Sequence, residues 1–230
     1  MEQQISIQPI AHIRNDFEEK FGIPRQSGRA PSLTAEIVFL PAFRHPDFLR
    51  GIEQFSHLWL LFDFSLTRKE GFSPTVRPPR LGGNKRVGVF ASRSPFRPNH
   101  IGLSCVRLLE VKQTPTEGFV LVVAGADLLN GTPILDIKPY LPFTDAHADA
   151  TGGYASQNQT HRLQVIFPQP LLEKIPQEKR AGLTECLADD PRPSYQADER
   201  SYGMRFAQFE IQFSVRENVL TVTDVQRVNS

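Results

Sequence analysis

Short runs of alternating apolar and polar residues dominate the first two thirds of the chain. Alternation with a period of two is typical of half-buried β-strands. Five such runs predict strands at residues 35–40, 57–64, 86–92, 103–111 and 118–129. The polar segment TPTEG separates the last two runs and predicts a hairpin loop. Strands at this short spacing, with few helices between them, favour a barrel or a sandwich over a parallel doubly wound sheet.

Helical periodicity is rarer in this part of the chain. The segment DFEEKFG at 16–22 predicts one or two helical turns. A second helix is predicted at 46–55, where Phe48, Ile52 and Phe55 are spaced i, i+4, i+7 behind a proline suited to a helix start. Both predicted helices are short beside the strands.

The pattern changes near residue 150. The small, polar stretch ATGGYASQNQTH predicts a linker or a long loop. It is followed by the short apolar run VIFP, a helical segment at 171–190 and two alternating runs at 205–215 and 219–228. Phe206 is out of phase in the first of these runs and predicts a β-bulge. We therefore predict a β-rich body over residues 1–150 and a small α+β domain over 151–230.

Composition places the chain among ordinary globular proteins. Its 230 residues are 40% hydrophobic and 22% charged, enough for a core without disulfide staples. Cys105 and Cys186 are the only cysteines, which favours a reducing compartment. The chain has neither a signal-peptide pattern nor the run of roughly 18 apolar residues that a membrane span needs. These observations predict a soluble cytoplasmic protein.

Several common chemistries lack their sequence signatures. No GxGxxG follows a predicted strand, and no Walker loop, HExxH or GxSxG occurs. The six histidines are scattered, and none has the spacing of a metal ligand relative to a second donor. We therefore expect neither a Rossmann-type nucleotide site nor a metal.

Charge is distributed unevenly, although the net charge is only +1. The stretch 71–109 has no acidic residue. Arginine forks pair with phosphates and carboxylates in bidentate fashion, so the stretch suits an anion-binding surface. A solvated basic face paired with acids elsewhere is the alternative. The basic residues of the stretch are Arg77, Arg80, Lys85, Arg86, Arg93, Arg97 and Arg107.

The loop SRSPFRPNHIG at 92–102 lies inside this basic stretch. Its two prolines restrict the backbone, so the loop is expected to be stiff. Arg93 and Arg97 are the natural donors to a carboxylate or a phosphate. Asn99 and His100 either read polar edges of a base or cap the turn into the next strand. The loop is thus either a binding site or a structural turn.

Two further segments hold candidate residues. In GADLLNGTPILDIKPYLPF, Asn130 and the following glycine predict a tight turn before another strand. Asp127 either accepts from a ribose hydroxyl or an amine, or forms a turn. Lys138 either meets an anion or is solvated. In SHLWLLFDF, Trp59 is expected in the core, whereas His57 is either a buried histidine or a ligand.

The segment DPRPSY at 190–195 is the last motif. Prolines on both sides hold Arg192 extended, and Asp190, Arg192 and Tyr195 have the chemistry to clamp a nucleic acid by charge and stacking. A plain helix stop explains the prolines equally well.

Two segments resemble the TsaA-like, YaeB-type family: KRVGVFASRSPFRPNHIGLS at 85–104 and GADLLNGTPILDIKPY. The segment DPRPSY resembles the C-terminal motif of the bacterial members of this family. The family is similar in activity to TrmO, which uses S-adenosylmethionine to methylate the exocyclic N6 of threonylcarbamoyladenosine at tRNA position 37, next to the anticodon. The resemblance covers most of the chain. It implies a mainly β fold, with a single-sheet antiparallel β-barrel body and a small α+β C-terminal domain. It also implies a homodimer with the cofactor near the subunit interface.

The resemblance also implies roles for particular residues. Asp190, Arg192 and Tyr195 match the tail motif, which binds tRNA or completes the active site. The remaining basic face is expected to contact tRNA, through Lys85, Arg86, Arg97 and Lys138. The implied cofactor contacts are Pro24, Arg25, Gln26, His57, Leu58, Arg93, Leu103, Asp127, Leu128, Leu129 and Asn130.

Methylation of the exocyclic N6 requires the methyl donor and this nitrogen to be aligned. Removal of the proton from the nitrogen would speed the reaction. Tyr195 and His100 are candidate bases, Arg192 is a candidate for stabilising the anion, and substrate-assisted deprotonation is an alternative. Two other functions are compatible with the sequence. One is a non-catalytic RNA-binding barrel that uses the basic stretch, and the other is a small-molecule methyltransferase that leaves DPRPSY idle.

Overall fold

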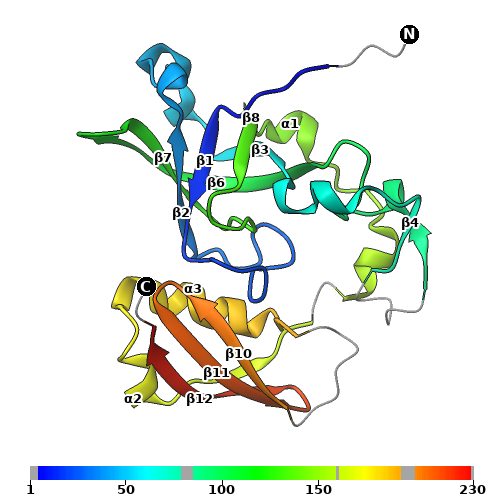
Figure 1. Cartoon of the computed structure of the whole chain (residues 1–230), viewed down its shortest axis with the longest axis vertical. Coiled ribbons are helices and arrows are strands. Elements are labelled where there is room, and N and C mark those ends of the chain that lie inside the picture. Colours follow the sequence, from blue (N-terminus) through cyan, green and yellow to red (C-terminus); the bar gives the residue numbers. More distant parts are fainter. Residues whose placement is uncertain (1–4, 79–84, 159–160, 193–199, 229–230) are drawn as a thin grey trace.

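The chain builds two separate β-sheets, one in each half. The computed structural model describes residues 5–78, 85–158, 161–192 and 200–228. Figure 1 shows the first sheet above the second. The predictions of a mainly β chain and of a distinct C-terminal unit with both helix and sheet are confirmed for the described residues.

The first sheet closes on itself. Its strands follow the order β1–β2–β7–β6–β3–β8, and every neighbouring pair is antiparallel. The seam between β1 and β8 is short, pairing Ala11 with Ile134 and His12 with Pro133. The strands are β1 (Ala11–Arg14), β2 (Thr34–Phe39), β3 (His57–Asp63), β6 (Ile101–Thr114), β7 (Gly118–Ala124) and β8 (Pro133–Pro139).

Alternation along these strands fills the inside of the ring. Leu58 and Leu60 on β3 are fully buried, whereas Trp59 between them is only partly buried. Ile37 on β2 and Leu121 on β7 are paired neighbours and are buried in the same cluster. Strand β6 is long because its second half continues into the hairpin with β7, with a β-bulge between Leu108 and Glu110. The predicted hairpin at TPTEG is confirmed.

The second sheet has the order β10–β11–β12–β9. Its first three strands are antiparallel, and β9 runs parallel to β12. Helix α3 contributes Leu183, Cys186 and Leu187 to the core beneath the sheet. The elements are β9 (Gln164–Ile166), α2 (Gln169–Leu172), α3 (Gln177–Ala188), β10 (Ser201–Phe206), β11 (Phe209–Arg216) and β12 (Val219–Arg227).

The segment between β1 and β2 joins the two halves. Phe17, Ala30 and Leu33 are buried in the C-terminal core and not in that of the ring. Phe17 packs edge-on against Phe206, with ring centroids 5.5 Å apart. Figure 1 shows this blue segment extending from the ring toward α3. The division at residue 150 stays a prediction, and this early segment belongs to the packing of the later unit.

Smaller elements connect the ring strands. β4 (Thr75–Val76) pairs with β5 (Val87–Gly88) to form a two-stranded ribbon. Helix α1 (Pro142–Asp145) follows β8. Six 3-10 turns complete the described elements: η1 (Pro41–Phe43), η2 (Pro46–Leu49), η3 (Ile52–Gln54), η4 (Ser65–Glu70), η6 (Val89–Ala91) and η7 (Gly153–Asn158).

Three helix predictions need correction. Residues 16–22 form bends and a turn, because Phe17 and Phe21 both reach the C-terminal core. The helix predicted at 46–55 is split into η2 and η3 by Gly51, whose φ of 86° lies outside the helical region. The segment 171–190 holds the second half of α2 and all of α3, not one helix, and Pro176 occupies the N-cap position of α3.

The strand predictions are mostly right, with three exceptions. The run 118–129 forms a strand only over Gly118–Ala124. Of the run 86–92, only Val87–Gly88 is a strand, and a 3-10 turn at Val89–Ala91 follows. The bulge predicted at Phe206 is wrong, because Phe206 ends β10. Ala207, with φ at 52°, turns the chain into β11, so the phase change marks a hairpin.

A close contact between Gly182 of α3 and Leu33 fixes the distance between the helix and the joining segment. A Cβ at Gly182 would lie 2.9 Å from Leu33 Cδ2 and 3.2 Å from its Cα. Alanine normally favours a helix over glycine by about 1 kcal/mol, whereas overpacking costs about 1–3 kcal/mol.

We therefore expect Gly182→Ala to lower the free energy of unfolding by about 1 kcal/mol, measured by urea titration. Gly88→Ala is the control, because a Cβ there has no heavy atom within 4 Å. A gain of stability in Gly182→Ala would show that the contact is looser than described.

Candidate functional site

The loop 24–29, which begins with the three implied cofactor contacts Pro24, Arg25 and Gln26, lies against the segment 125–128. The amide of Gly28 donates to the carbonyl of Gly125 at 2.8 Å. Gly125 has φ at 77°, and a Cβ there would lie 3.3 Å from the Gly28 backbone, so both conformation and space require glycine. The amide of Cys105 on β6 donates to Ser27 Oγ at 3.3 Å. The 24–29 loop is therefore attached to the ring at two points.

Asp127 forms the polar centre of this contact. Its carboxylate accepts from Ser104 Oγ at 2.5 Å and also from the Ser27 amide. Burial raises the pKa of Asp127 above the ordinary value, although these hydrogen bonds and the charge of Arg93 act in the opposite direction. Ser104 is 2% exposed and projects from β6 toward Asp127. A partly buried carboxylate beside a guanidinium suits recognition of a cationic or hydroxyl group.

Arg93 comes from the loop after β5 and meets the 24–29 loop. Its Nη1 donates to Gln26 Oε1 at 2.8 Å, and both side chains are exposed. The structure thus brings together Gln26, Arg93 and Asp127, three of the residues that the resemblance implied. Leu103 is 47% exposed and precedes Ser104, so it faces the opposite side of β6.

The rest of the proline-rich loop is held by its own hydrogen bonds. Arg97 Nη1 donates to the carbonyl of Ser92 at 3.1 Å, so this arginine braces the loop. His100 has φ at 50°, and its Nε2 is buried without a hydrogen-bond partner in the described structure. In this conformation, that nitrogen is shielded from a bound substrate. Pro24, the first residue of the 24–29 loop, is buried.

The other residues after Asp127 have structural contacts. Leu128 is buried in the ring core, and Leu129 packs against the C-terminal core. Asn130 Oδ1 accepts from the Asn15 amide at 3.1 Å, and its Nδ2 donates to Glu18 at 2.8 Å. Gly131 has φ at 75°, so the predicted tight turn is present.

The remaining predicted residues of the body lie elsewhere. His57 pairs with Arg107 across the sheet, three residues along β6 from Ser104, or about 10 Å. Its Nδ1 lies 2.9 Å from Ser56 Oγ. Leu58 is fully buried in the ring core. Trp59 is less buried than predicted, and its Nε1 donates to Asp145 at 3.0 Å.

The basic residues expected to contact tRNA are spread over several elements. Lys138 on β8 forms an ion pair with Asp136 at 2.8 Å. Arg86 is exposed, and its Nη1 donates to Thr75 Oγ1 at 2.8 Å. Lys85 is exposed beside it. These side chains are available to an anionic surface, but the structure does not gather them around Asp127.

The start of the tail motif meets the 24–29 loop. Asp190 accepts from Arg192 Nε at 2.9 Å and lies 2.9 Å from His161 Nε2. Burial acts to raise the pKa of Asp190, but the hydrogen bonds from Arg192 and His161 outweigh burial and lower it. The Arg25 guanidinium donates to the carbonyls of Asp190 and Arg192. Tyr195 lies outside the described residues.

Sequence reasoning missed three residues of this region: Ser27, Ser104 and Asp189. Asp189 is 2% exposed, and its Oδ1 lies 2.6 Å from Arg29 Nε. A polar residue at an inward position of an alternating strand was the available signal for Ser104. An acidic pair at the C-terminus of a helix, where the helix dipole disfavours it, was the signal for Asp189.

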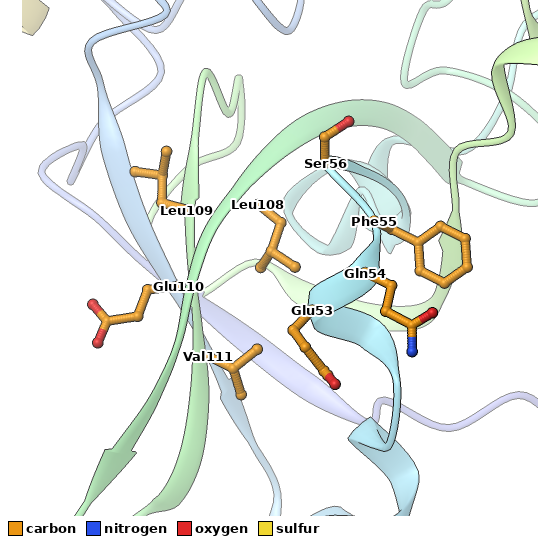
Figure 2. A pocket seen from close by; sticks show the side chains of 8 residues that line it. All are labelled: Glu53, Gln54, Phe55, Ser56, Leu108, Leu109, Glu110 and Val111. Carbon is orange, nitrogen blue, oxygen red and sulfur yellow. The ribbon is translucent and has the colours of Figure 1, made fainter.

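A measurable pocket lies away from this region. It has a volume of about 250 Å³ and is formed by η3 and the bulged part of β6. Figure 2 shows Glu53 and Glu110 among its lining side chains. The negative charges of these two residues would repel a polyanion. None of the predicted site residues lines it, so we place the candidate site at Gln26, Arg93 and Asp127.

Metal-binding clusters and membrane-spanning helices are both absent from the described residues. In the ranges that the structure describes, no three His, Cys, Asp or Glu residues cluster in a way that could hold a metal ion. No helix within those ranges has both the length and the apolar character needed to cross a membrane. Cys105 and Cys186 are both free.

Comparison with known proteins gives consistent matches over both halves. The model of the tRNA-methyltransferase O N-terminal domain matches residues 12–146, and that of the TrmO C-terminal domain matches residues 160–228. The chain is 43% identical over 216 residues to the tRNA (adenine(37)-N6)-methyltransferase of Escherichia coli K12, with 91% of each covered. It is 42% identical over 240 residues to a putative S-adenosylmethionine-dependent methyltransferase, RcsF, of Pseudomonas aeruginosa, with 96% of this chain and 97% of the relative covered.

A solved structure is similar over the full length. The crystal structure of TrmO from P. aeruginosa superposes with a TM-score of 0.80 at 36% identity and covers 99% of each chain.

Because the pKa of Asp127 is raised in the folded protein, ionisation of this carboxyl group lowers the stability of the fold as pH rises. Below the ordinary value of 3.8 the carboxyl is neutral in both folded and unfolded states, and the cost is absent. As pH rises toward the raised folded pKa, the unfolded chain ionises more readily, so stability is lost. We expect Asp127→Asn to raise the unfolding temperature at pH 7, with the difference shrinking toward pH 3 in thermal scans.

Asp224→Asn is the matched control with the opposite sign. Hydrogen bonds from Gln226 and the Val225 amide lower the pKa of Asp224, so its replacement should reduce stability at pH 7. If Asp127→Asn were also destabilised at pH 7, the burial cost at Asp127 would be refuted.

Proposed function

Because the chain belongs to the tRNA-methyltransferase O family, we propose that it transfers a methyl group from S-adenosylmethionine to the N6 of threonylcarbamoyladenosine at tRNA position 37. The observation that carries this proposal is the convergence of Gln26, Arg93 and Asp127 in a chain that matches both family domains. We further propose that the closed ring is a single-sheet β-barrel catalytic body, and that the enzyme is a cytoplasmic homodimer.

The chemistry of the site fits the cofactor. S-adenosylmethionine offers a carboxylate, an amino group, a sulfonium and ribose hydroxyls, and when bound it supplies an electrophilic methyl group. Arg93 would hold the carboxylate, because it is exposed and, among the residues that the structure describes, its side chain hydrogen-bonds only to Gln26. Asp127 would accept from the amino group or a ribose hydroxyl. Its orientation is set by Ser104 and the Ser27 amide before any ligand arrives.

The acceptor nitrogen lies between an adenine ring and a carbonyl, so its proton is relatively acidic. Stabilising the resulting anion would help the reaction. Of the two candidate bases, His100 has a shielded Nε2 and Tyr195 is outside the described residues. Arg192 is held in place by Asp190 and would meet the threonyl carboxylate or the anion. Substrate-assisted deprotonation agrees with this arrangement.

Recognition of tRNA would use the exposed basic residues outside this centre. Lys85 and Arg86 flank the β4–β5 ribbon, and phosphate contacts of this kind make affinity depend on salt. The contact between the tail motif and the 24–29 loop favours this substrate over a small molecule, because a small-molecule enzyme would leave the tail idle.

The proposed function makes a prediction about the substrate. Purified enzyme should incorporate labelled methyl groups into tRNA carrying the threonylcarbamoyl group and not into the same tRNA lacking it. Equal labelling of both tRNAs, or none of the modified one, would rule out the proposed specificity. Tight tRNA binding with no affinity for S-adenosylmethionine would instead support a non-catalytic RNA-binding protein.

The proposed function also predicts different roles for the arginines, in cofactor binding or in tRNA binding. Arg93→Ala should weaken S-adenosylmethionine binding by about 10-fold to 100-fold, since a charge-assisted hydrogen bond contributes about 1.5–3 kcal/mol. Arg86→Ala, an exposed arginine of the same basic stretch, should leave that affinity unchanged and reduce the salt dependence of tRNA binding. Arg192→Ala should also spare the cofactor while lowering tRNA turnover. Calorimetry that showed the reverse pattern would overturn this division.

A further inference from the structure

Two phenylalanines are exposed at one end of the β4–β5 ribbon. Phe72 is 65% exposed and precedes β4, and Phe90 is 80% exposed and follows β5. The two strands are antiparallel, so the start of β4 and the end of β5 lie at the same end of the ribbon. The amide of Val89 donates to the carbonyl of Pro74 at 3.0 Å and extends the pairing toward both phenylalanines. Figure 1 shows β4 at the edge of the molecule.

The backbone that carries each phenyl group is held by hydrogen bonds and by burial. Val89, the first residue of η6, is 3% exposed and anchors the turn that contains Phe90. Ser92 Oγ donates to the carbonyl of Val89 at 2.8 Å. On the other strand, the amide of Ser73, which follows Phe72, donates to the carbonyl of Phe96 at 3.3 Å. A side chain mounted on an ordered backbone loses less freedom when a ligand covers it.

The charge of the ribbon indicates what covers these side chains. The stretch 71–109 has no acidic residue. Arg77, Lys85 and Arg86 are exposed at the other end of the ribbon, and Arg86 Nη1 reaches back to Thr75 Oγ1 at 2.8 Å. The core of a protein–protein interface is depleted of charge, whereas unpaired RNA presents phosphates together with unstacked bases. Exposed aromatic side chains among cations therefore suit single-stranded RNA.

Phe90 also lies close to the candidate site. It precedes Arg93 by three residues, so their Cα atoms are at most about 11 Å apart. Arg93 in turn donates to Gln26 at 2.8 Å. When the base to be methylated enters the site, the nucleotides beside it are therefore within reach of the ribbon.

We propose that Phe72 and Phe90 stack against unpaired bases of the anticodon loop beside position 37. The exposed cations of the same ribbon then hold the phosphates of that loop. The proposal rests on the proposed function and adds base contacts to it. Every base has a face on which an aromatic side chain can stack, so these contacts position the loop without reading its sequence.

Binding of an anticodon stem-loop RNA, measured by fluorescence anisotropy, tests the two phenylalanines directly. Phe72→Leu and Phe90→Leu keep an apolar side chain but lose the aromatic face, so each should weaken binding by about 5-fold to 50-fold. Phe90→Trp should bind at least as tightly as wild type. Phe48→Leu is the matched control and should leave the affinity unchanged, because Phe48 is 64% exposed but lies outside the basic stretch. Unchanged affinity in both ribbon variants would overturn the proposal.

Salt dependence and cofactor affinity separate stacking from other effects. Phe90→Leu should lower the affinity for the stem-loop by the same factor at every salt concentration. Arg86→Ala should instead reduce the slope of log affinity against log salt by about 1. Calorimetry should give an S-adenosylmethionine dissociation constant for Phe90→Leu within about 3-fold of wild type. A loss of cofactor affinity as large as that in Arg93→Ala would show that Phe90 acts at the cofactor site, against the proposal.

Three further outcomes have distinct meanings. A smaller mass of either leucine variant by light scattering, with unchanged RNA affinity, would show that the phenyl groups contact a second copy of the chain and would overturn the proposal. Failure of wild type to bind the stem-loop would overturn it even if whole tRNA were methylated. If wild type bound the stem-loop through Phe72 and Phe90 but transferred no methyl group, the proposed function would fall and the stacking contacts would stand.

Discussion

The carboxylate of Asp189 is the group on which the joint between the two halves depends. It is almost completely buried, and it faces Arg29 and the Arg25 amide, both from the segment between β1 and β2. Removing one partner of a buried charge pair costs about 3–5 kcal/mol, because the other charge is left uncompensated. The surrounding contacts act in the same direction. Phe17 packs on Phe206, and Lys179 pairs with Asp16 at 2.5 Å.

This joint explains how a loop outside regular secondary structure acquires a defined shape. The 24–29 loop is bound on one side to the ring, through Gly28 and Ser27, and on the other side to the tail, through Arg25 and Arg29. A loop fixed from both sides holds Gln26 opposite Arg93 before a ligand binds. Preorganisation of that kind reduces the ordering cost of binding. The C-terminal unit thus helps to fix the shape of the loop that carries Gln26.

Much of the fold follows from periodicity, because each ring strand buries one face and exposes the other. Period two therefore predicts β2, β3, β6 and β7 to within a few residues at most ends. The failures have local causes. Phe206 and Phe209 are both buried on either side of a two-residue turn, so their spacing resembles a bulge. The segment 16–22 has helical composition, but its phenylalanines are committed to a core formed some 190 residues later.

The site was predictable in part for the same reason. Stiff loops with arginines and an isolated Asp127 are visible locally, and the motifs point to them. The partners of these residues are not local. Ser104 reaches Asp127 across 23 positions, and Arg25 reaches Asp190 across 165, so only the folded chain reveals the pairs. Sequence therefore identified candidate residues of the site but not the long-range contacts that Arg25 and Ser104 make.

Backbone strain gives an independent indication of the same region. In the described residues, four that are not glycine have positive φ, and two of them, Ala207 and Glu217, are explained by hairpin turns. The other two are His100 in the proline-rich loop and Asp190 at the start of the tail motif. Strained conformations persist only where surrounding contacts enforce them, and they concentrate at functional sites. The burial of the Asp127 carboxylate also costs stability. His100, Asp190 and Asp127 thus lie in three different segments, and each of these segments contacts the 24–29 loop.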